Sequence, residues 1–194
     1  MNERFLRAKH WQLFLLTFGI PMIFQIIMMI SMFASIGNNS QPNPTFMMNY
    51  FTAFPLMMLI FTGVFFGWFW AVAVGLQSKV PQDVTMKVTK FKVFLFIPLV
   101  YILFLLGFMA TTMNGPFQYG TPPNPGMFGL IVPLHLFSMF CIFYCLYFVA
   151  KTFKTVELQR KVTFSDFAGE FFMIWFYPIG IWIIQPKINK MVGQ

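Results

Sequence analysis

The stretch that decides the fold is residues 151–190, KTFKTVELQRKVTFSDFAGEFFMIWFYPIGIWIIQPKINK. Its first half mixes acidic and basic side chains and favours water. Its second half contains a run of 15 uncharged residues, 171–185, which is interrupted by Pro178 and Gly180 and followed by Pro186. This run is short for a membrane span, which needs about 20 apolar residues, and too apolar for a solvated loop. Whether it crosses the membrane decides the topology of the entire chain.

The composition indicates that lipid, rather than water, surrounds most of the chain. Of 194 residues, 58% are hydrophobic and only 9% are charged, whereas soluble domains carry about 25% charged residues. The net charge of +8 does not indicate a nucleic-acid partner, because no extended basic domain is available to follow a phosphate backbone. Cys141 and Cys145 lie together in one apolar run and do not form the disulfide framework of a secreted protein.

Four apolar runs predict an all-α membrane protein with four transmembrane helices. They cover about residues 11–36, 46–76, 93–113 and 128–150. At about 1.5 Å per residue, a helix over each run is long enough to cross a hydrocarbon core of about 30 Å. We expect residues 1–150 to form a four-helix transmembrane bundle. We expect residues 151–194 to form a cytoplasmic charged segment that ends in an interfacial aromatic tail.

All basic residues lie on one side of these predicted spans. The thirteen are Arg4, Arg7, Lys9, Lys79, Lys87, Lys90, Lys92, Lys151, Lys154, Arg160, Lys161, Lys187 and Lys190. Basic residues mark the cytoplasmic side of a membrane protein. We therefore expect both termini to be cytoplasmic, and we expect residues 171–185 not to cross the bilayer.

Residues 171–185 then form an interfacial or re-entrant segment on the cytoplasmic side. We expect Trp175, Tyr177 and Trp182 at the depth of the lipid headgroups. Lys187 and Lys190 are expected to hold the end of the chain at the anionic inner leaflet.

The same segment contains its own start and stop signals. Thr163 and Asp166 form a possible capping box that predicts a short amphipathic helix ahead of the apolar run. Pro178 lacks an N–H group and disfavours helical geometry in the residue before it, so we expect a bend at Tyr177. Gly180 and Pro186 are further interruptions. We place the interaction surface of the protein in this segment.

Small residues recur at every fourth position of the second span. They are Gly63, Gly67, Ala71 and Gly75. On a helix they form one ridge that lets another helix approach closely, which is a main source of attraction between helices in lipid. The ridge either packs within the chain or docks a partner subunit, and the sequence leaves both interpretations open.

The spans offer little chemistry. They contain no Asp, Glu, Lys or Arg, and His135 is their one group that titrates near neutral pH. His135 shares a helix face with Ser138, Cys141 and Cys145; this set is either a packing face or, less favoured, a metal or haem ligand set. Gln25 is expected to form a hydrogen bond across helices. We expect no cofactor and no bound metal. An enzyme with chemistry near Asp166 and Glu170 is the third choice.

The C-terminal segment resembles the end of small uncharacterised four-span inner-membrane proteins of Bacteroidota-type bacteria. The similar residues are Glu170, 178–182 (PIGIW) and 185–189 (QPKIN), about a tenth of the chain. The resemblance implies a bacterial inner membrane and brings no functional residues with it. The leading hypothesis is a non-catalytic integral membrane subunit or accessory protein of a larger inner-membrane complex, with lipid and other membrane-protein subunits as partners. The alternative is a small oligomeric channel or carrier for a neutral or lipid-like solute.

Overall fold

The computed structural model describes residues 2–39, 44–113 and 125–193, and every regular element in these ranges is helical. The elements are α1 (Asn2–Arg7), α2 (His10–Phe14), the π-helix η1 (Leu15–Gly19), α3 (Ile20–Asn39), α4 (Pro44–Gly75), the 3-10 helix η2 (Gln77–Lys79), α5 (Val88–Met113), α6 (Pro125–Leu158), α7 (Phe164–Trp175) and α8 (Tyr177–Val192).

Four helices are long and apolar enough to cross a membrane, which confirms the four predicted spans. The candidate spans are His10–Ala34, Ala53–Lys79, Val88–Ala110 and Gly129–Leu158. The first is one continuous rod made of α2, η1 and α3. The fourth helix continues beyond the predicted end at residue 150, and reaches Leu158. It continues because Phe153 and Val156 are buried against the other helices at this end, and the first residue with a positive φ is Gln159, at 50°.

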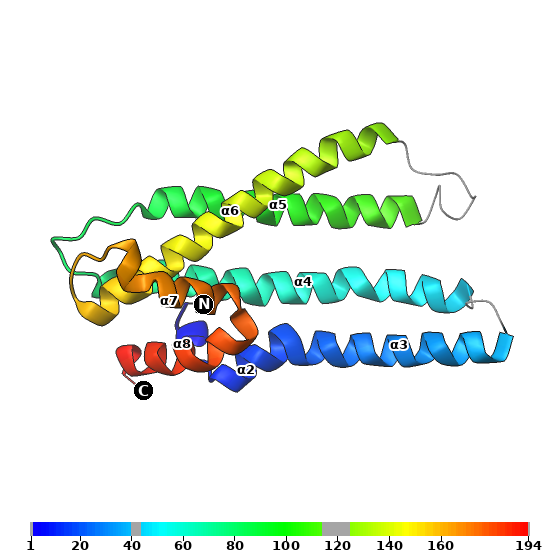
Figure 1. Ribbon diagram of the computed structural model, residues 1–194, viewed down its shortest axis with the longest axis horizontal. Coiled ribbons are helices and arrows are strands. Elements are labelled where there is room, and N and C mark those ends of the chain that lie inside the picture. The colour runs from blue at the N-terminus through cyan, green and yellow to red at the C-terminus, as the bar shows by residue number, and fades with distance from the viewer. Residues whose placement is uncertain (1, 40–43, 114–124, 194) are drawn as a thin grey trace.

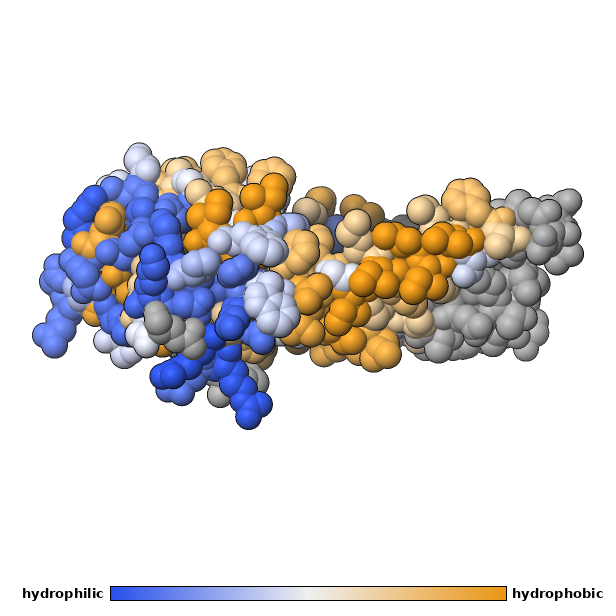
Figure 2. Space-filling view, turned by 90° about the horizontal axis from the view of Figure 1, so that it is seen from below, coloured by the Kyte–Doolittle hydropathy of each residue, from blue (hydrophilic) through white to orange (hydrophobic). Residues whose placement is uncertain are grey.

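The long helices form two hairpins, α3–α4 and α5–α6, that lie side by side (Figure 1). Helix α6 crosses over α5 at one end and diverges from the bundle toward the other. Both termini, η2 and the α6–α7 connection lie at the same end, together with α1, α7 and α8. Hydrophilic residues gather at this end on the face shown in Figure 2, and hydrophobic surface covers the middle of the molecule. This placement agrees with the clustering of basic residues in the sequence.

The best-packed core lies at the charged end rather than in the middle of the spans. Trp68, Phe91, Phe153, Phe167 and Ile181 are fully buried there, contributed by five helices. In contrast, only 11% of the most apolar window of the first span is buried within the chain. We call the packed region, formed by α1, α7, α8 and the adjoining ends of α4, α5 and α6, the cap.

Within the cap, α7 and α8 form a helical hairpin. The break between them lies at Phe176, whose ψ of 57° is not helical, one residue before the predicted bend. Pro178 occupies the first turn of α8, where its missing N–H group needs no partner. The expected interruptions at Gly180 and Pro186 are wrong, since α8 runs through both residues to Val192.

Candidate functional site at the charged end

A buried glutamine joins three parts of the cap. The chain bends between α1 and α2, so carbonyl groups at the end of α1 have no helical partner. The Gln185 amide donates hydrogen bonds to the carbonyl oxygens of Phe5 at 3.0 Å, Leu6 at 3.2 Å and Ala8 at 2.9 Å. Asn189, one turn later on α8, donates to the carbonyls of Leu6 and Ala8 at 2.8 and 3.2 Å. Helix α8 therefore caps α1.

The side-chain oxygen of Gln185 connects α8 to α4. The indole N–H of Trp68 donates to the Gln185 side-chain oxygen at 2.8 Å, and both side chains are buried. We call Trp68, Gln185 and Asn189 the clasp. Sequence reasoning missed it, although two amide side chains spaced four residues apart on one face of a helix, among apolar residues, are a usable signal. Both amides belong to the residues that carry the resemblance noted above.

Ion pairs hold the outside of the cap. Lys154 on α6 contacts Glu157 at 2.7 Å and Glu170 of α7 at 2.8 Å, and Lys187 of α8 contacts Glu157 at 3.0 Å. Arg160 contacts Asp166 at 2.8 Å. The two carboxylates considered for catalysis, Asp166 and Glu170, are therefore each held by a cation. This arrangement ties α6, α7 and α8 together.

The predicted capping box at the start of α7 is confirmed. The Asp166 carboxylate accepts hydrogen bonds from the Thr163 N–H at 2.7 Å and the Thr163 hydroxyl at 2.9 Å. A hydrogen bond from Arg160 has the largest effect on the pKa of Asp166. Together with the two hydrogen bonds from Thr163, it holds this pKa well below its usual range. A lowered pKa in the folded state means that the carboxylate stabilises α7 fully above the unfolded pKa of about 4. This stabilisation declines progressively as pH falls from there toward the lowered pKa of the folded state.

We expect the first turn of α7 to lose hydrogen-exchange protection as pH falls below about 4. In Asp166→Asn the protection should already be lower at pH 7 and should show no further acid step. Asp83→Asn, in an exposed connection, is the matched control. An acid step of equal size in Asp166→Asn would mean that another group is responsible.

The residues of the predicted interfacial tail fall into different environments. Trp175, Trp182, Lys187 and Lys190 are exposed, Pro178 is half-buried, and Tyr177 and Gly180 are buried. The expectation that Tyr177 meets lipid headgroups is therefore wrong. Its ring packs edge-on against Phe65 and Trp68 of α4, at centroid distances of 5.2 and 5.4 Å. The alternation of exposed and buried residues follows from the two faces of α8, one of which packs into the cap.

The predicted small-residue ridge on α4 does not face one environment. Ala71 is buried in the core and Gly75 is half-buried. A Cβ atom on Gly67 would lie 2.8 Å from the ring of Phe5, so this glycine makes room for α1. A Cβ atom on Gly63 would meet nothing within 4 Å. The inner part of the ridge thus contacts the chain itself, and the part at Gly63 is open.

We expect Gly67→Val to push α1 away from α4 and destabilise the cap by about 1–3 kcal/mol, as overpacking does. Protease cleavage near the N-terminus should then become faster. Gly63→Val is the control and should leave the cleavage rate unchanged. Equal cleavage rates in the two variants would show that the packing of Phe5 against α4 does not require a glycine at position 67.

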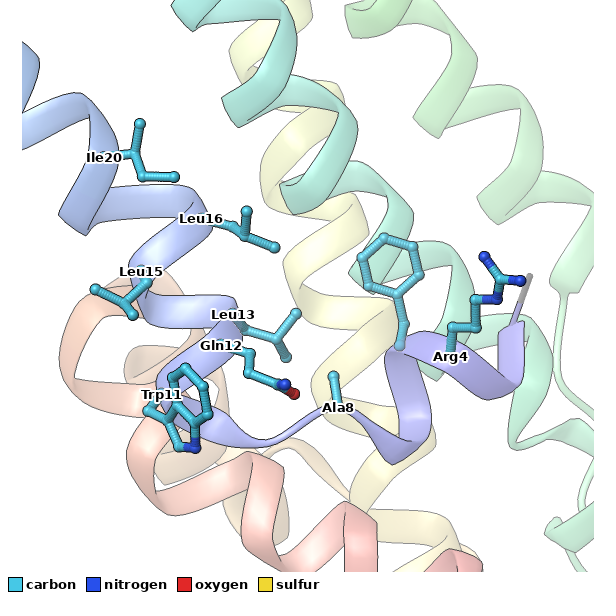
Figure 3. Close-up of a pocket in the computed structure, with 9 residues that line it drawn as sticks. Arg4, Ala8, Trp11, Gln12, Leu13, Leu15, Leu16 and Ile20 are labelled. Atoms are coloured by element: carbon cyan, nitrogen blue, oxygen red, sulfur yellow. The ribbon is translucent and has the colours of Figure 1, made fainter.

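An open groove lies where α1 meets the start of the first span (Figure 3). It has a volume of about 630 Å³ and is lined by Arg4, Phe5, Ala8, Trp11, Gln12, Leu13, Leu15, Leu16 and Ile20. Leu13, Leu16 and Gln12 point toward the opening from one side and Ala8 from the other, while Arg4 lies at the far rim. Apolar side chains dominate the walls. The groove therefore has one charged end and a long apolar part.

The fourth span holds His135 near a second groove. The Tyr101 hydroxyl and His135 Nδ1 are 3.2 Å apart, and Tyr101 also lines an apolar groove of about 720 Å³ between α5 and α6. His135 is exposed, whereas Ser138, Cys141 and Cys145 are buried and the cysteines are free. The side chains predicted to share one face therefore face different surroundings. No group of three metal-ligating side chains occurs among the described residues.

The chain matches no protein-family model, no curated protein and no solved structure. The geometry of its own residues is therefore what carries a functional proposal.

Proposed function

We propose that this protein is a non-catalytic integral membrane subunit or accessory protein of a bacterial inner-membrane complex. It docks on another membrane protein through its spans, rather than through the C-terminal segment in which the sequence placed the interaction surface. The observation that carries the proposal is the exposed imidazole of His135 in an apolar helix. Polar side chains in membrane helices rarely face hydrocarbon and usually mark a protein contact or a functional site. A hydrogen-bonding group on a partner helix would satisfy the imidazole.

The surroundings of His135 support a protein partner. Its neighbours on the diverging part of α6 are apolar and exposed, including Val132, Leu136, Met139 and Phe140. The His135 ring has one hydrogen-bond partner among the described residues, Tyr101 at Nδ1, which leaves Nε2 free to bond to a partner. Packing plus a few interhelical hydrogen bonds is how helices associate in lipid.

Gln25 on α3 gives a second, independent indication. Its side chain is exposed and forms no hydrogen bond with any part of the chain that the structure describes. The expected bond across helices is therefore not made within these residues. A buried or lipid-facing amide without a partner costs roughly 1–3 kcal/mol or more. An interface with another subunit would remove that cost.

Residue-specific cross-linking tests this proposal. A photoreactive residue replacing Leu136 should cross-link to one discrete partner in native membranes, and the additional substitution His135→Leu should weaken the cross-link. Met139→Leu is the matched control on the same exposed helix. Cross-linking to lipid alone, unchanged by His135→Leu, would contradict the proposal. A cross-link between two identical copies would instead favour the oligomeric channel or carrier.

A further inference from the structure

We propose that the groove between α1 and the start of the first span binds one anionic phospholipid of the bilayer. Its acyl chain lies between the leucines of η1 and the side chains of Phe5 and Ala8, and its phosphate meets Arg4. This inference does not depend on the proposed docking function, because the groove lies at the cap rather than on α6.

The charged end of the groove suits a phosphate. Lys154, Arg160 and Lys187 are engaged by carboxylates, whereas Arg4 forms no ion pair with any residue the structure describes. The guanidinium group is planar and matches phosphate oxygens in a bidentate way. Gln12 lies in the same lining; its side-chain oxygen accepts the Lys9 N–H at 2.9 Å. The side-chain NH₂ group of Gln12 is left to donate.

The apolar part of the groove is shaped by the π-helix. Helix η1 spans Leu15–Gly19, and π-helical turns inside longer helices often occur at functional sites. The Thr17 hydroxyl is buried and donates to the Leu13 carbonyl at 2.7 Å, so the polar group of this turn faces inward. A Cβ atom on Gly19 would lie 2.7 Å from the Leu15 side chain, so the Leu15 side chain lies where a larger residue at position 19 would be. The turn thus presents leucines outward.

The position of the groove favours membrane lipid as the occupant. Leu15, Leu16 and Ile20 are 42%, 40% and 44% exposed and continue directly into the exposed apolar surface of α3. An acyl chain can enter sideways from the bilayer without leaving hydrocarbon. The volume of about 630 Å³ lies within the range of about 300–1,000 Å³ that is usual for small-molecule sites. Arg4 lies on α1, which precedes the first span and belongs to the charged end of the molecule, where headgroups are expected.

Native mass spectrometry of the full chain with added lipid tests this site. We expect bound phosphatidylglycerol to exceed phosphatidylcholine on the wild-type protein. Arg4→Gln should lower phosphatidylglycerol binding about tenfold, which is the loss expected when a hydrogen bond to a charged group is removed. Leu16→Trp, which fills the groove, should lower the binding of both lipids.

Arg7→Gln is the matched control, because Arg7 is exposed on the same helix but does not line the groove. It should retain wild-type binding. Equal losses in Arg4→Gln and Arg7→Gln would overturn the proposal, since they would indicate general attraction to a basic surface. Equal binding of the two lipids by the wild type would also overturn it. Arg4 is exposed, so its substitution tests binding even if Leu16→Trp folds poorly.

Discussion

Gln185→Leu should destabilise the cap by roughly 3 kcal/mol or more. Leucine has a similar size but cannot bond, so the indole N–H of Trp68 and carbonyl groups of the α1–α2 connection are left without partners. Each buried polar group that loses its partner costs about 1–3 kcal/mol. Gln185 is fully buried, so water cannot replace the lost bonds. Denaturant titration in detergent micelles measures the change in the free energy of unfolding.

The control for this variant is Gln82→Leu. Gln82 is exposed in the α4–α5 connection, so the same chemical change should alter the free energy of unfolding by less than about 0.5 kcal/mol. The clasp also predicts a local effect, since in Gln185→Leu the first nine residues should become accessible to protease before the spans unfold. If the two variants are equally stable, the clasp does not hold the cap together.

Gly180→Ala should disrupt the α7–α8 hairpin. A Cβ atom on Gly180 would overlap with the backbone carbonyl of Met173 on α7, and a backbone group cannot turn aside as a side chain can. Overpacking of this kind typically costs about 1–3 kcal/mol and sometimes more. Because Tyr177 and Ile181 flank the contact and are buried, the strain should spread into the core. Tryptophan fluorescence during unfolding reports the loss.

Gly169→Ala makes the comparison on the neighbouring helix. Gly169 is exposed within α7, and a Cβ atom there would meet nothing within 4 Å. Alanine should therefore stabilise α7 by roughly 0.5–1 kcal/mol through its better helix propensity. Opposite signs for the two glycines are the expected result. A neutral Gly180→Ala variant would show that α7 and α8 are not in close contact there.

The sequence predicted features that depend on neighbours along the chain. The four spans follow from uninterrupted apolar runs, and the start of α7 follows from the Thr163–Asp166 pair. The predicted end of the fourth helix at residue 150 is too early, because the charged residues that follow are part of α6. The helix continues because Phe153 and Val156 pack into the core of the cap, and it ends at Leu158, just before the positive φ of Gln159.

Features that depend on distant partners were not predictable in the same way. Gln185 bonds to Phe5, Leu6 and Ala8, which precede it by 177 to 180 positions in the sequence. No local pattern indicates which helix lies opposite Gln185. The burial of Tyr177 has the same origin, because Phe65 and Trp68 come from α4. An aromatic residue near a run of lysines suits both a membrane interface and a core, and only the packing of α8 on α4 decides between them.

Cysteine accessibility in intact cells tests the topology most directly. In a background with Cys141→Ala and Cys145→Ala, one cysteine replaces Ser78 at the charged end. Another replaces Ser40, which follows α3 in the sequence and lies outside the described residues. A membrane-impermeant reagent added outside the inner membrane should label the cysteine at residue 40 and should label the one at residue 78 only after the membrane is opened. Labelling in the reverse order, or equal labelling of both in intact membranes, would contradict a four-span protein whose charged cap faces the cytoplasm.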